Sequence, residues 1–468
     1  MMATIIVPLL GAFVVLCFGR WQRAQKISAV LIAVCTSLLS ILQLPIVLKG
    51  EVLVWQIAFI PGFNLNFTAD ALAVFMAFSA SLIGALIVLY SIQYMDDDEH
   101  QSEYYFFVLL FIGSMMGLVY SANLILMYIF WEMTAICSWR LIGHNWHKTQ
   151  HLVNADKAFL ITVFGSTCMI IGFELLFQRS HTFDFAQLKG VMPSFGVALL
   201  IIAGILAKSA QLPMQTWLPD AGVAPSPVTA LLHAAVLVKI GAFAFARIFL
   251  TTLVLPPGFK EFFLILILIG VLVTACAALV ENDLKRILAY STISQIGLIL
   301  IGFAIGNVAA VAGGLFYIFA HGLAKAGLFL GGGVIDHYMK ERDIRKLHGM
   351  AKLFPVNSLG FFLCALSIMG IPPFGGFFAK VLILVGAVQQ HRIMLALGIG
   401  LSAILSILYI MRLWTTVFMG TPTENKIGRK FDLMSLVVII FGIFSLLSIG
   451  LLRYPIDLIT NITSQILK

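Results

Sequence analysis

Charge is scarce in this chain. Only 11% of its 468 residues are Asp, Glu, Lys or Arg, whereas 61% are hydrophobic and the mean hydropathy is +1.03. Apolar runs of roughly 18 to 25 residues, the length that crosses a bilayer as a helix, recur along the sequence. Because lipid offers the backbone no hydrogen bonds, each segment must satisfy its own amides. The sequence therefore predicts an all-α polytopic membrane protein.

Several chemical motifs are missing from the sequence as well. The six cysteines stand singly in apolar segments without a CxxC pair, which argues against an iron–sulfur cluster, a structural zinc or a disulfide framework. The phosphate loops GxGxxG and GxxxxGK[ST], the zinc motif HExxH and a Ser/His/Asp set are absent too. We therefore expect neither a metal nor a cofactor in this chain.

Segments of crossing length predict about fourteen transmembrane helices. We expect them near residues 2–19, 27–48, 69–93, 104–121, 123–142, 156–178, 194–217, 226–250, 259–280, 287–305, 309–335, 353–386, 393–418 and 432–452. The first is expected to be a retained span, since no basic residue precedes it and no cleavage site follows. Between the second and third spans, EVLVWQIAFIPGFNLNFTAD alternates apolar and polar residues around Pro61-Gly62, which predicts a hairpin.

Basic residues are concentrated in alternate loops, by about two to one, and this bias predicts the orientation. It places both termini and the hairpin outside a cell's inner (cytoplasmic) membrane. The net charge of +8 therefore indicates topology and not a nucleic-acid footprint. The loops predicted to lie inside carry Arg20, Arg23, Lys26, Arg140, Lys148, Lys157, Lys285, Arg286, Lys340, Arg342, Arg345, Lys346, Lys352, Lys426, Arg429 and Lys430.

Two of the spans are interrupted in the same way. AKSAQLPMQTW places Lys208 ahead of Pro213, and LSIMGIPPFGGFFAK places Pro372 and Pro373 ahead of Lys380. Proline removes a backbone donor, so helices 7 and 12 should break near mid-membrane. An odd number of crossings separates the breaks, which predicts two inverted five-helix repeats. The alternative is that these prolines only kink two helices for packing.

This repeat divides the chain into four parts. Helices 1–3 and the hairpin occupy 1–103, helices 4–8 form the first repeat at 104–250, helices 9–13 form the second at 259–418, and helix 14 lies in 419–468.

Seven ionisable residues lie inside predicted spans: Glu132, Lys208, His233, Lys239, His321, Lys325 and Lys380. Placing a charged side chain at the bilayer centre costs at least about 2.5 to 3.5 kcal/mol of insertion free energy. The presence of each of these residues therefore requires an explanation. We expect Glu132 and Lys208 to pair, and His321 and Lys325 share one helical face. The alternatives are that Lys239 and Lys380 snorkel to the interface and that His233 is a hydrogen-bonded core residue. Together the set suits a proton relay.

At these residues the sequence resembles the antiporter-like membrane subunits of the complex I superfamily. The resemblance runs from about Asp70 to Arg412. It is carried by YIFWEMTAICSW, AKSAQLPMQTWLPDA, PSPVTALLHAA, ENDLKRILAYSTISQIG, HGLAKAGLFL and GIPPFGGFFAK. It implies that Glu132 and Lys208 form the gate of a proton path, and that the path continues through His233, His321, Lys325 and Lys380.

The resemblance does not decide to which multisubunit complex the chain belongs. It implies that iron–sulfur clusters and nickel–iron or flavin centres lie in partner subunits of a redox-driven complex, beside further antiporter-like subunits. Lys and His favour protons, whereas Na⁺ prefers oxygen ligands. A member of an Mrp-type Na⁺/H⁺ antiporter is the alternative, and a non-conducting scaffold is a third. Val163 and Ser166 stand where the largest complex I member often carries Arg and Asp, and the chain has no long lateral helix, so we expect a shorter family member.

Overall fold

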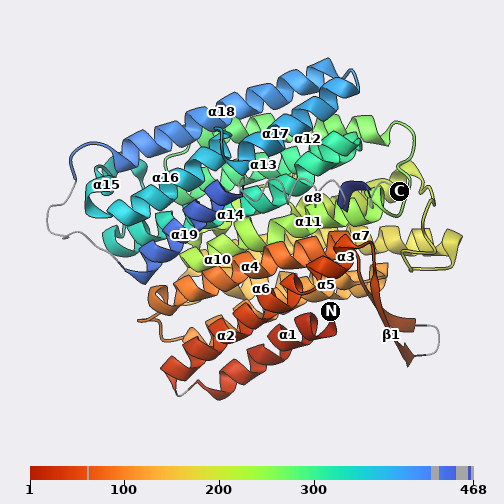
Figure 1. Ribbon diagram of the computed structural model, residues 1–468, viewed down its shortest axis with the longest axis horizontal. Helices are drawn as coiled ribbons and strands as arrows, with labels where there is room; N and C mark the ends of the chain where they lie inside the picture. The colour runs from red at the N-terminus through yellow and green to blue at the C-terminus, as the bar shows by residue number, and fades with distance from the viewer. Residues whose placement is uncertain (20, 61–62, 423–431, 449–461, 465–468) are drawn as a thin grey trace.

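Helices running along one direction make up almost the whole computed structural model (Figure 1). The model describes residues 1–19, 21–60, 63–422, 432–448 and 462–464. Within these residues, ten helices are long and apolar enough to cross a membrane, and five shorter apolar helices accompany them. The prediction of a polytopic helical membrane protein is confirmed at this level.

The amino-terminal part contains the predicted hairpin. Its elements are α1 (Met2–Cys17), α2 (Gln22–Ile41), α3 (Leu44–Leu48), β1 (Leu53–Ile60), β2 (Phe63–Ala69) and α4 (Ala71–Tyr94). The strands pair antiparallel from Leu53 opposite Ala69. β2 is tied to the bundle, since the Ala122 amide donates to the Asn66 carbonyl at 2.9 Å. The hairpin prediction is confirmed, while its Pro61-Gly62 turn lies outside the described residues.

Two further groups of helices complete the chain. The first comprises α5 (Gln101–Tyr120), α6 (Leu124–Ile142), α7 (Thr149–Ser180), α8 (Phe195–Lys208), α9 (Trp217–Asp220), η1 (Ala221–Val223), α10 (Ser226–Ala230), η2 (Leu231–Ala235), α11 (Leu237–Phe245) and η3 (Ala246–Leu250). The second comprises α12 (Phe259–Val280), α13 (Leu284–Ile305), α14 (Val308–Met339), η4 (Ile344–Lys346), α15 (Met350–Leu353), α16 (Pro355–Met369), α17 (Gly375–Gln389), α18 (Ile393–Phe418) and α19 (Leu433–Leu447). The predicted end of the last span, residues 449–452, lies outside the described part.

Side-chain caps set the starts of several helices. The residue before the first helical turn accepts a hydrogen bond from an amide three residues further on, which satisfies a free donor. This holds for Asp70 before α4, Asn123 before α6, Ser194 before α8, Asp283 before α13, Asn307 before α14 and Asp432 before α19. The caps explain why these helices begin where the apolar runs begin.

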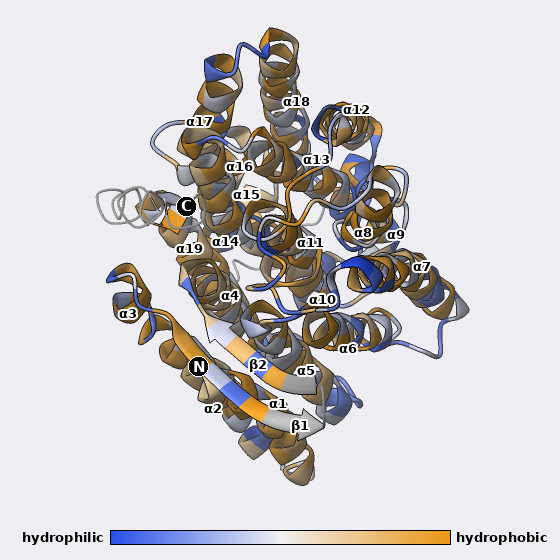
Figure 2. Cartoon of the chain, turned by 90° about the vertical axis from the view of Figure 1, so that its right-hand side faces the viewer, coloured by the Kyte–Doolittle hydropathy of each residue, from blue (hydrophilic) through white to orange (hydrophobic). Residues whose placement is uncertain are grey.

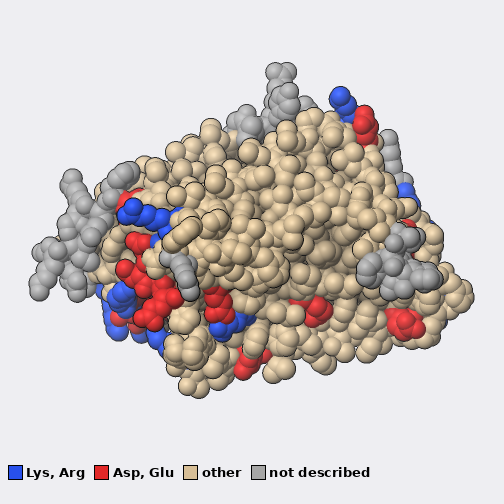
Figure 3. Space-filling view, turned by 90° about the horizontal axis from the view of Figure 1, so that it is seen from below, with Lys and Arg blue, Asp and Glu red and all other residues tan. Residues whose placement is uncertain are grey.

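The helices divide into an inner and an outer set. Seen from the hairpin end, α11, α13 and α14 lie at the centre, with α7, α12 and α18 toward the rim (Figure 2). The most apolar window of the stretch 226–250 is fully buried, whereas that of α12 is 44% buried, so outer helices such as α12 and α18 turn apolar side chains outward. Charged side chains gather at the ends of the molecule, away from a middle band that largely lacks them (Figure 3). This distribution fits a bilayer around the band.

The first predicted interruption is present at the end of α8. The helix stops at Lys208, and the next helical residues begin at Trp217. The freed carbonyls find side-chain partners: the Trp217 indole donates to the Ala207 carbonyl at 2.9 Å, and the Gln211 side-chain amide donates to the Ser209 carbonyl at 3.0 Å. The same Gln211 amide also donates to the Ile293 carbonyl of α13 at 3.1 Å. The break therefore lies against protein, as irregular backbone within a membrane requires.

The second interruption separates α16 from α17. Gly370 ends α16 in the left-handed conformation, at φ 77°, which a residue without Cβ adopts freely. After a short non-helical stretch, α17 begins at Gly375. A Cβ on Gly376 would fall on the carbonyl oxygen of Ser367, so this approach of α17 to α16 is possible only for glycine. Both breaks are interruptions of the helix, so the alternative of simple kinks is wrong.

We expect Gly376→Ala to destabilise the fold by about 1–3 kcal/mol, the usual cost of overpacking a filled site. The clash is with backbone, which cannot rotate away as a flexible side chain can. Thermal unfolding in detergent, followed by intrinsic fluorescence, measures the effect. Gly400→Ala in α18 is the matched control, because a Cβ there meets nothing within 4 Å. Equal midpoints for the two variants would show that the break does not depend on Gly376.

Candidate functional site

Lys208 is fully buried at the last residue of α8. Its Nζ donates to the carbonyl oxygen of Trp131 at 3.1 Å and lies 5.4 Å from the centre of the Trp131 ring. Glu132 follows Trp131 on α6 and is near enough to act on the lysine charge, but its Oε1 is buried without a hydrogen-bond partner among the described residues. The predicted direct ion pair between Glu132 and Lys208 is therefore wrong for this conformation, because the ammonium faces Trp131.

His233 and Lys239 lie on the irregular helix 226–250, in which two π-helical turns, η2 and η3, flank α11. Single π turns are common at functional sites. His233 packs against the ring of Phe329, with 4.3 Å between ring centres, and neither of its ring nitrogens has a partner in the described residues. His233 is thus a buried core residue without a hydrogen bond to another described protein group, and the choice between a core role and a role in the relay stays a prediction.

Lys239 points into the bundle and not toward an interface. Its exposed fraction is 1%, and its Nζ donates to the Ala234 carbonyl. A Cβ on Gly322 of α14 would collide with this ammonium, which places Lys239 beside His321. The snorkelling alternative is wrong for this lysine, and the spacing between His233 and Lys239 gave no indication of the direction it faces.

His321 and Lys325 occupy adjacent turns of one face of α14, as predicted. Lys325 Nζ donates to two groups of α13, the Leu288 carbonyl at 2.9 Å and the Ser291 hydroxyl at 2.7 Å. Both ring nitrogens of His321 are buried and unpartnered within the described structure. Their hydrogen bonds therefore do not fix either ring to a neighbouring protein group.

Lys380 is buried on the first turns of α17, just after the second interruption. Its Nζ donates to the Ile368 carbonyl at 2.6 Å and to the Ser406 hydroxyl at 2.9 Å, and it lies 6.0 Å from the centre of the Tyr317 ring. The Ile368 carbonyl belongs to the end of α16. The lysine therefore connects both sides of the break and does not snorkel.

A hydrogen-bonded network that the sequence did not predict joins Lys325 to Tyr317. The Ser291 hydroxyl, bound by Lys325, donates to the hydroxyl of Tyr409 at 2.9 Å, and the Gln295 amide donates to the same oxygen at 3.1 Å. Tyr317 in turn donates to the side-chain carbonyl of Gln295. The Tyr317 ring lies beside Lys380 and, at 5.6 Å between centres, beside His321. Polar residues one turn apart in an apolar span, such as Ser291 and Gln295, were the available signal.

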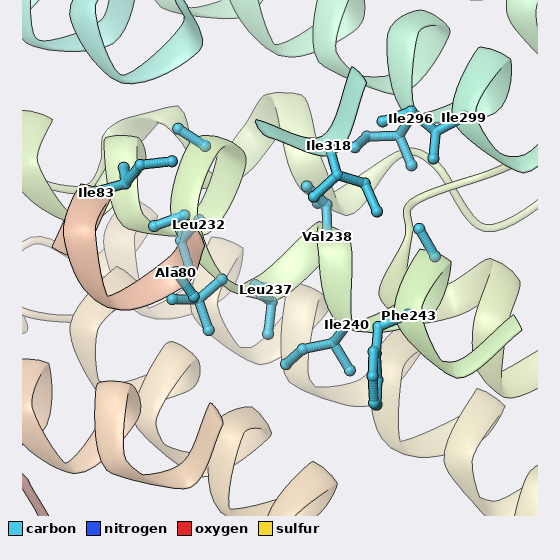
Figure 4. Close-up of a cluster of buried hydrophobic side chains, with 14 of the residues drawn as sticks. Ala80, Ile83, Leu232, Leu237, Val238, Ile240, Phe243, Ile296, Ile299 and Ile318 are labelled. Atoms are coloured by element: carbon cyan, nitrogen blue, oxygen red, sulfur yellow. The ribbon is translucent and has the colours of Figure 1, made fainter. Parts of the chain in front are cut away.

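The structure brings five of the seven predicted residues into one electrostatic neighbourhood. Lys239, Lys325, Lys380 and His233 all interact electrostatically with His321. The helices that carry or border these residues also hold a cluster of buried apolar side chains, among them Ile83, Leu232, Val238 and Ile318 (Figure 4). The other two residues interact with each other, since the charge of Glu132 acts on Lys208. Six of the seven residues are buried and Glu132 is partly buried; we call the seven together the buried axis.

Ionic groups also gather where the chain leaves the bundle opposite the hairpin. Lys285 is buried and binds Asp336 at 3.1 Å, and Arg342 binds the same carboxylate at 3.0 Å. Nearby, burial raises the pKa of Asp98, but the hydrogen bonds and charges of His144 and His100 together outweigh this, so the net pKa lies below its usual value. Asp336 and Arg342 line a hollow of about 460 Å³ at this end. Water can therefore reach the ion pairs from this side.

Such an architecture, a polytopic helical bundle with a chain of buried lysines and histidines, is typical of membrane subunits that carry ions. Sequence comparison makes the class specific. Residues 121–406 match the family described as NADH:quinone oxidoreductase/Mrp antiporter, TM, and residues 60–105 match the amino-terminal family of NADH-ubiquinone oxidoreductase (complex I) chain 5. The chain belongs to this antiporter-like superfamily, which confirms the predicted resemblance.

Individual relatives come from both branches of the superfamily. The chain is 32% identical to a Na(+)/H(+) antiporter subunit of Alkalihalophilus pseudofirmus, over 86% of the chain and 55% of that protein. It is 32% identical to the NAD(P)H-quinone oxidoreductase subunit 5 of Paulinella chromatophora, over 92% of the chain and 69% of that protein. The chain thus spans about half to two thirds of these relatives. The predicted preference for shorter members stays a prediction.

A solved structure shares the fold. A chain of the Mrp complex from Dietzia sp. superposes with a TM-score of 0.90, covering 100% of this chain and 97% of that one, at 22% sequence identity. The likeness establishes the arrangement of the helices.

Proposed function

We propose that this chain carries protons through the membrane along the buried axis, as one member of a multisubunit complex. One observation supports this most: Lys239, Lys325 and Lys380 are buried, and within the described structure their hydrogen bonds all go to uncharged carbonyls and hydroxyls. A lysine with neutral partners can bind or release a proton without breaking an ion pair. Lysine and histidine do not suit Na⁺, which favours oxygen ligands.

The number and order of the helices support our proposal for the membrane topology. The ten long helices, together with α1, α8, the broken pair α16 and α17, and α19, make fourteen crossings. An odd number of crossings separates the interruption after Lys208 from the one before Lys380, so repeats over 104–250 and 259–418 would cross the membrane in opposite orientations. We place the hairpin and the amino terminus outside the inner membrane, because the opposite end carries the basic loops.

The complex that drives this chain is, in our proposal, a redox complex of the NADH:quinone oxidoreductase or membrane-bound hydrogenase kind, with its redox centres in partner subunits. The similarity to subunit 5 of a quinone oxidoreductase supports it. The similarity to a Na(+)/H(+) antiporter subunit favours a second candidate, membership of an Mrp-type Na⁺/H⁺ antiporter.

Purification of the chain with its native partners separates the two candidates. Subunits with iron–sulfur clusters would support the redox complex, and only small membrane subunits would support the antiporter. In vesicles, quenching of a pH-sensitive dye on addition of the electron donor, or of Na⁺, tests proton movement itself. No pH change under either drive would contradict the proposal.

A substitution at Tyr409 tests whether the hydrogen-bonded network around it belongs to the proton path. Tyr409→Phe removes the hydroxyl that Ser291 and Gln295 share, so we expect proton transport to slow severalfold, in keeping with the about 0.5–1.5 kcal/mol that one hydrogen bond contributes. The initial rate of dye quenching measures it. Tyr105→Phe is the control, because that buried hydroxyl has no partner among the described residues. Equal rates for both variants would remove the network from the path.

A further inference from the structure

A hollow lies at the base of the hairpin, on the end of the molecule where α4 begins and η3 ends. Its volume is about 610 Å³, and its lining includes Asp70, Arg247, Asp184, Lys189, Ser121 and Thr252. We call it the vestibule. Its charged and hydroxyl lining differs from the apolar band around the bundle, and it is open to solvent at the hairpin side of the structure. It belongs to no part of the buried axis described above.

An ion pair forms the floor of the vestibule. Arg247 holds both carboxylate oxygens of Asp70, at 2.5 Å through Nη1 and 2.8 Å through Nη2. The arginine is 8% exposed, and its Nε is buried without a partner within the described structure. Two parallel bonds of this kind are strong and directional.

The same helix connects this ion pair to the buried axis. Lys239, Phe243 and Arg247 are spaced four residues apart, so they follow one face of the helix, and Arg247 lies 5.6 Å from the centre of the Phe243 ring. The separation from Lys239 to Arg247 is about 12 Å along the helix axis. The buried Phe243 ring (Figure 4) occupies this short interval. α4 borders both ends, with Ile83 next to Lys239 and Asp70 at Arg247.

We propose that the Asp70–Arg247 ion pair is the hairpin-side gate of the proton path and that the vestibule is the path's mouth at this end. The proposal rests on the function proposed above. When the ion pair opens, Arg247 turns toward the vestibule and water enters between Arg247 and Lys239. The Lys239 ammonium then gives its proton to this water and becomes a neutral amine, and the proton leaves through the vestibule. The ion pair forms again and closes the path. The same steps run in reverse for entry.

The gate can be tested without any driving reaction. The complex, reconstituted in vesicles with a trapped pH-sensitive dye, receives an imposed pH gradient, and the passive proton flux is recorded. Asp70→Asn keeps the helix cap, since Asn caps as well as Asp, but removes the charge that holds Arg247. We expect its passive flux to exceed that of the wild type severalfold. Arg247→Lys, which keeps the charge and loses the paired bonds, should leak to an intermediate extent.

Three comparisons make the result specific. Glu261→Gln breaks another doubly bonded ion pair, with Arg392 at 2.6 Å, that involves neither the vestibule nor the axis, and it should leave the flux unchanged. The exchanged pair Asp70→Arg with Arg247→Asp should restore the low flux. Adding Lys239→Met to Asp70→Asn should abolish the leak, because the gate opens onto that lysine.

Unchanged flux in folded Asp70→Asn and Arg247→Lys protein would overturn the proposal. So would a leak that persists without Lys239, since the protons would then cross elsewhere. These outcomes are distinct from a failure of the proposed function, which would show as driven proton transport that survives the loss of Lys208.

Discussion

Lys208→Ala abolishes proton transport by the assembled complex; this is the first of the two largest effects we expect. Lys208 is the fully buried ammonium at the interruption of α8, held by the Trp131 carbonyl and by that residue's ring. Alanine offers no group to carry the proton between Glu132 and the rest of the axis. Positioned proton carriers contribute about 10²- to 10⁴-fold, so a loss of at least about a hundredfold is expected. Dye quenching in vesicles, normalised to the amount of complex, measures it.

Lys49→Ala provides the control for this variant. Lys49 is exposed just after α3 and lies outside the axis, so its removal should leave the rate unchanged. Glu132→Gln should resemble Lys208→Ala if the carboxylate and the lysine exchange a proton when they approach. Undiminished pumping by both axis variants, with assembly intact, is incompatible with the proposed function.

Lys325→Met stops transport at the centre of the axis; this is the second large effect. Methionine fills most of the volume of lysine and adds no donor, so the packing of α14 survives while the bonds to Leu288 and Ser291 are lost. His321 also loses one of the three lysine charges that act on it. We expect a loss of at least about a hundredfold.

The matched control here is Lys352→Met on α15, an exposed lysine outside the spans. Thermal unfolding accompanies both measurements, because a loss of rate in an unfolded protein has no bearing on the path. Should folded Lys325→Met pump at the wild-type rate, the path would have to bypass α14.

Much of the fold could be predicted because lipid permits few structures. The apolar runs had to be helices, and the alternating stretch around residues 53–69 had to lie outside them as a hairpin. The interruptions after Lys208 and before Lys380 were also predictable, because proline and glycine act locally on the backbone. The deep lysines were conspicuous because each is costly in an apolar span.

Contacts between distant segments could not be predicted in this way. Tyr409 meets Ser291 from a position 118 residues further along the chain, and nothing in the local pattern marks that pairing. The direction of Lys239 depended on the missing side chain of Gly322, which opens room for the ammonium. The expected contact between Glu132 and Lys208 failed for a similar reason: the lysine binds the carbonyl of Trp131, and a pattern of charges says nothing about where backbone carbonyls lie.

The lysines of the axis stand near the middle of their helices or beside the breaks, and the axis runs from α8 through α11 and α14 to α17. A proton on this route moves sideways, parallel to the membrane plane. A charge that crosses the membrane does work of about 2.3 kcal/mol per 100 mV, but a sideways step crosses almost none of that voltage. The membrane potential should therefore change the rates of the entry and exit steps. It should leave the rates of transfer between the lysines nearly unchanged.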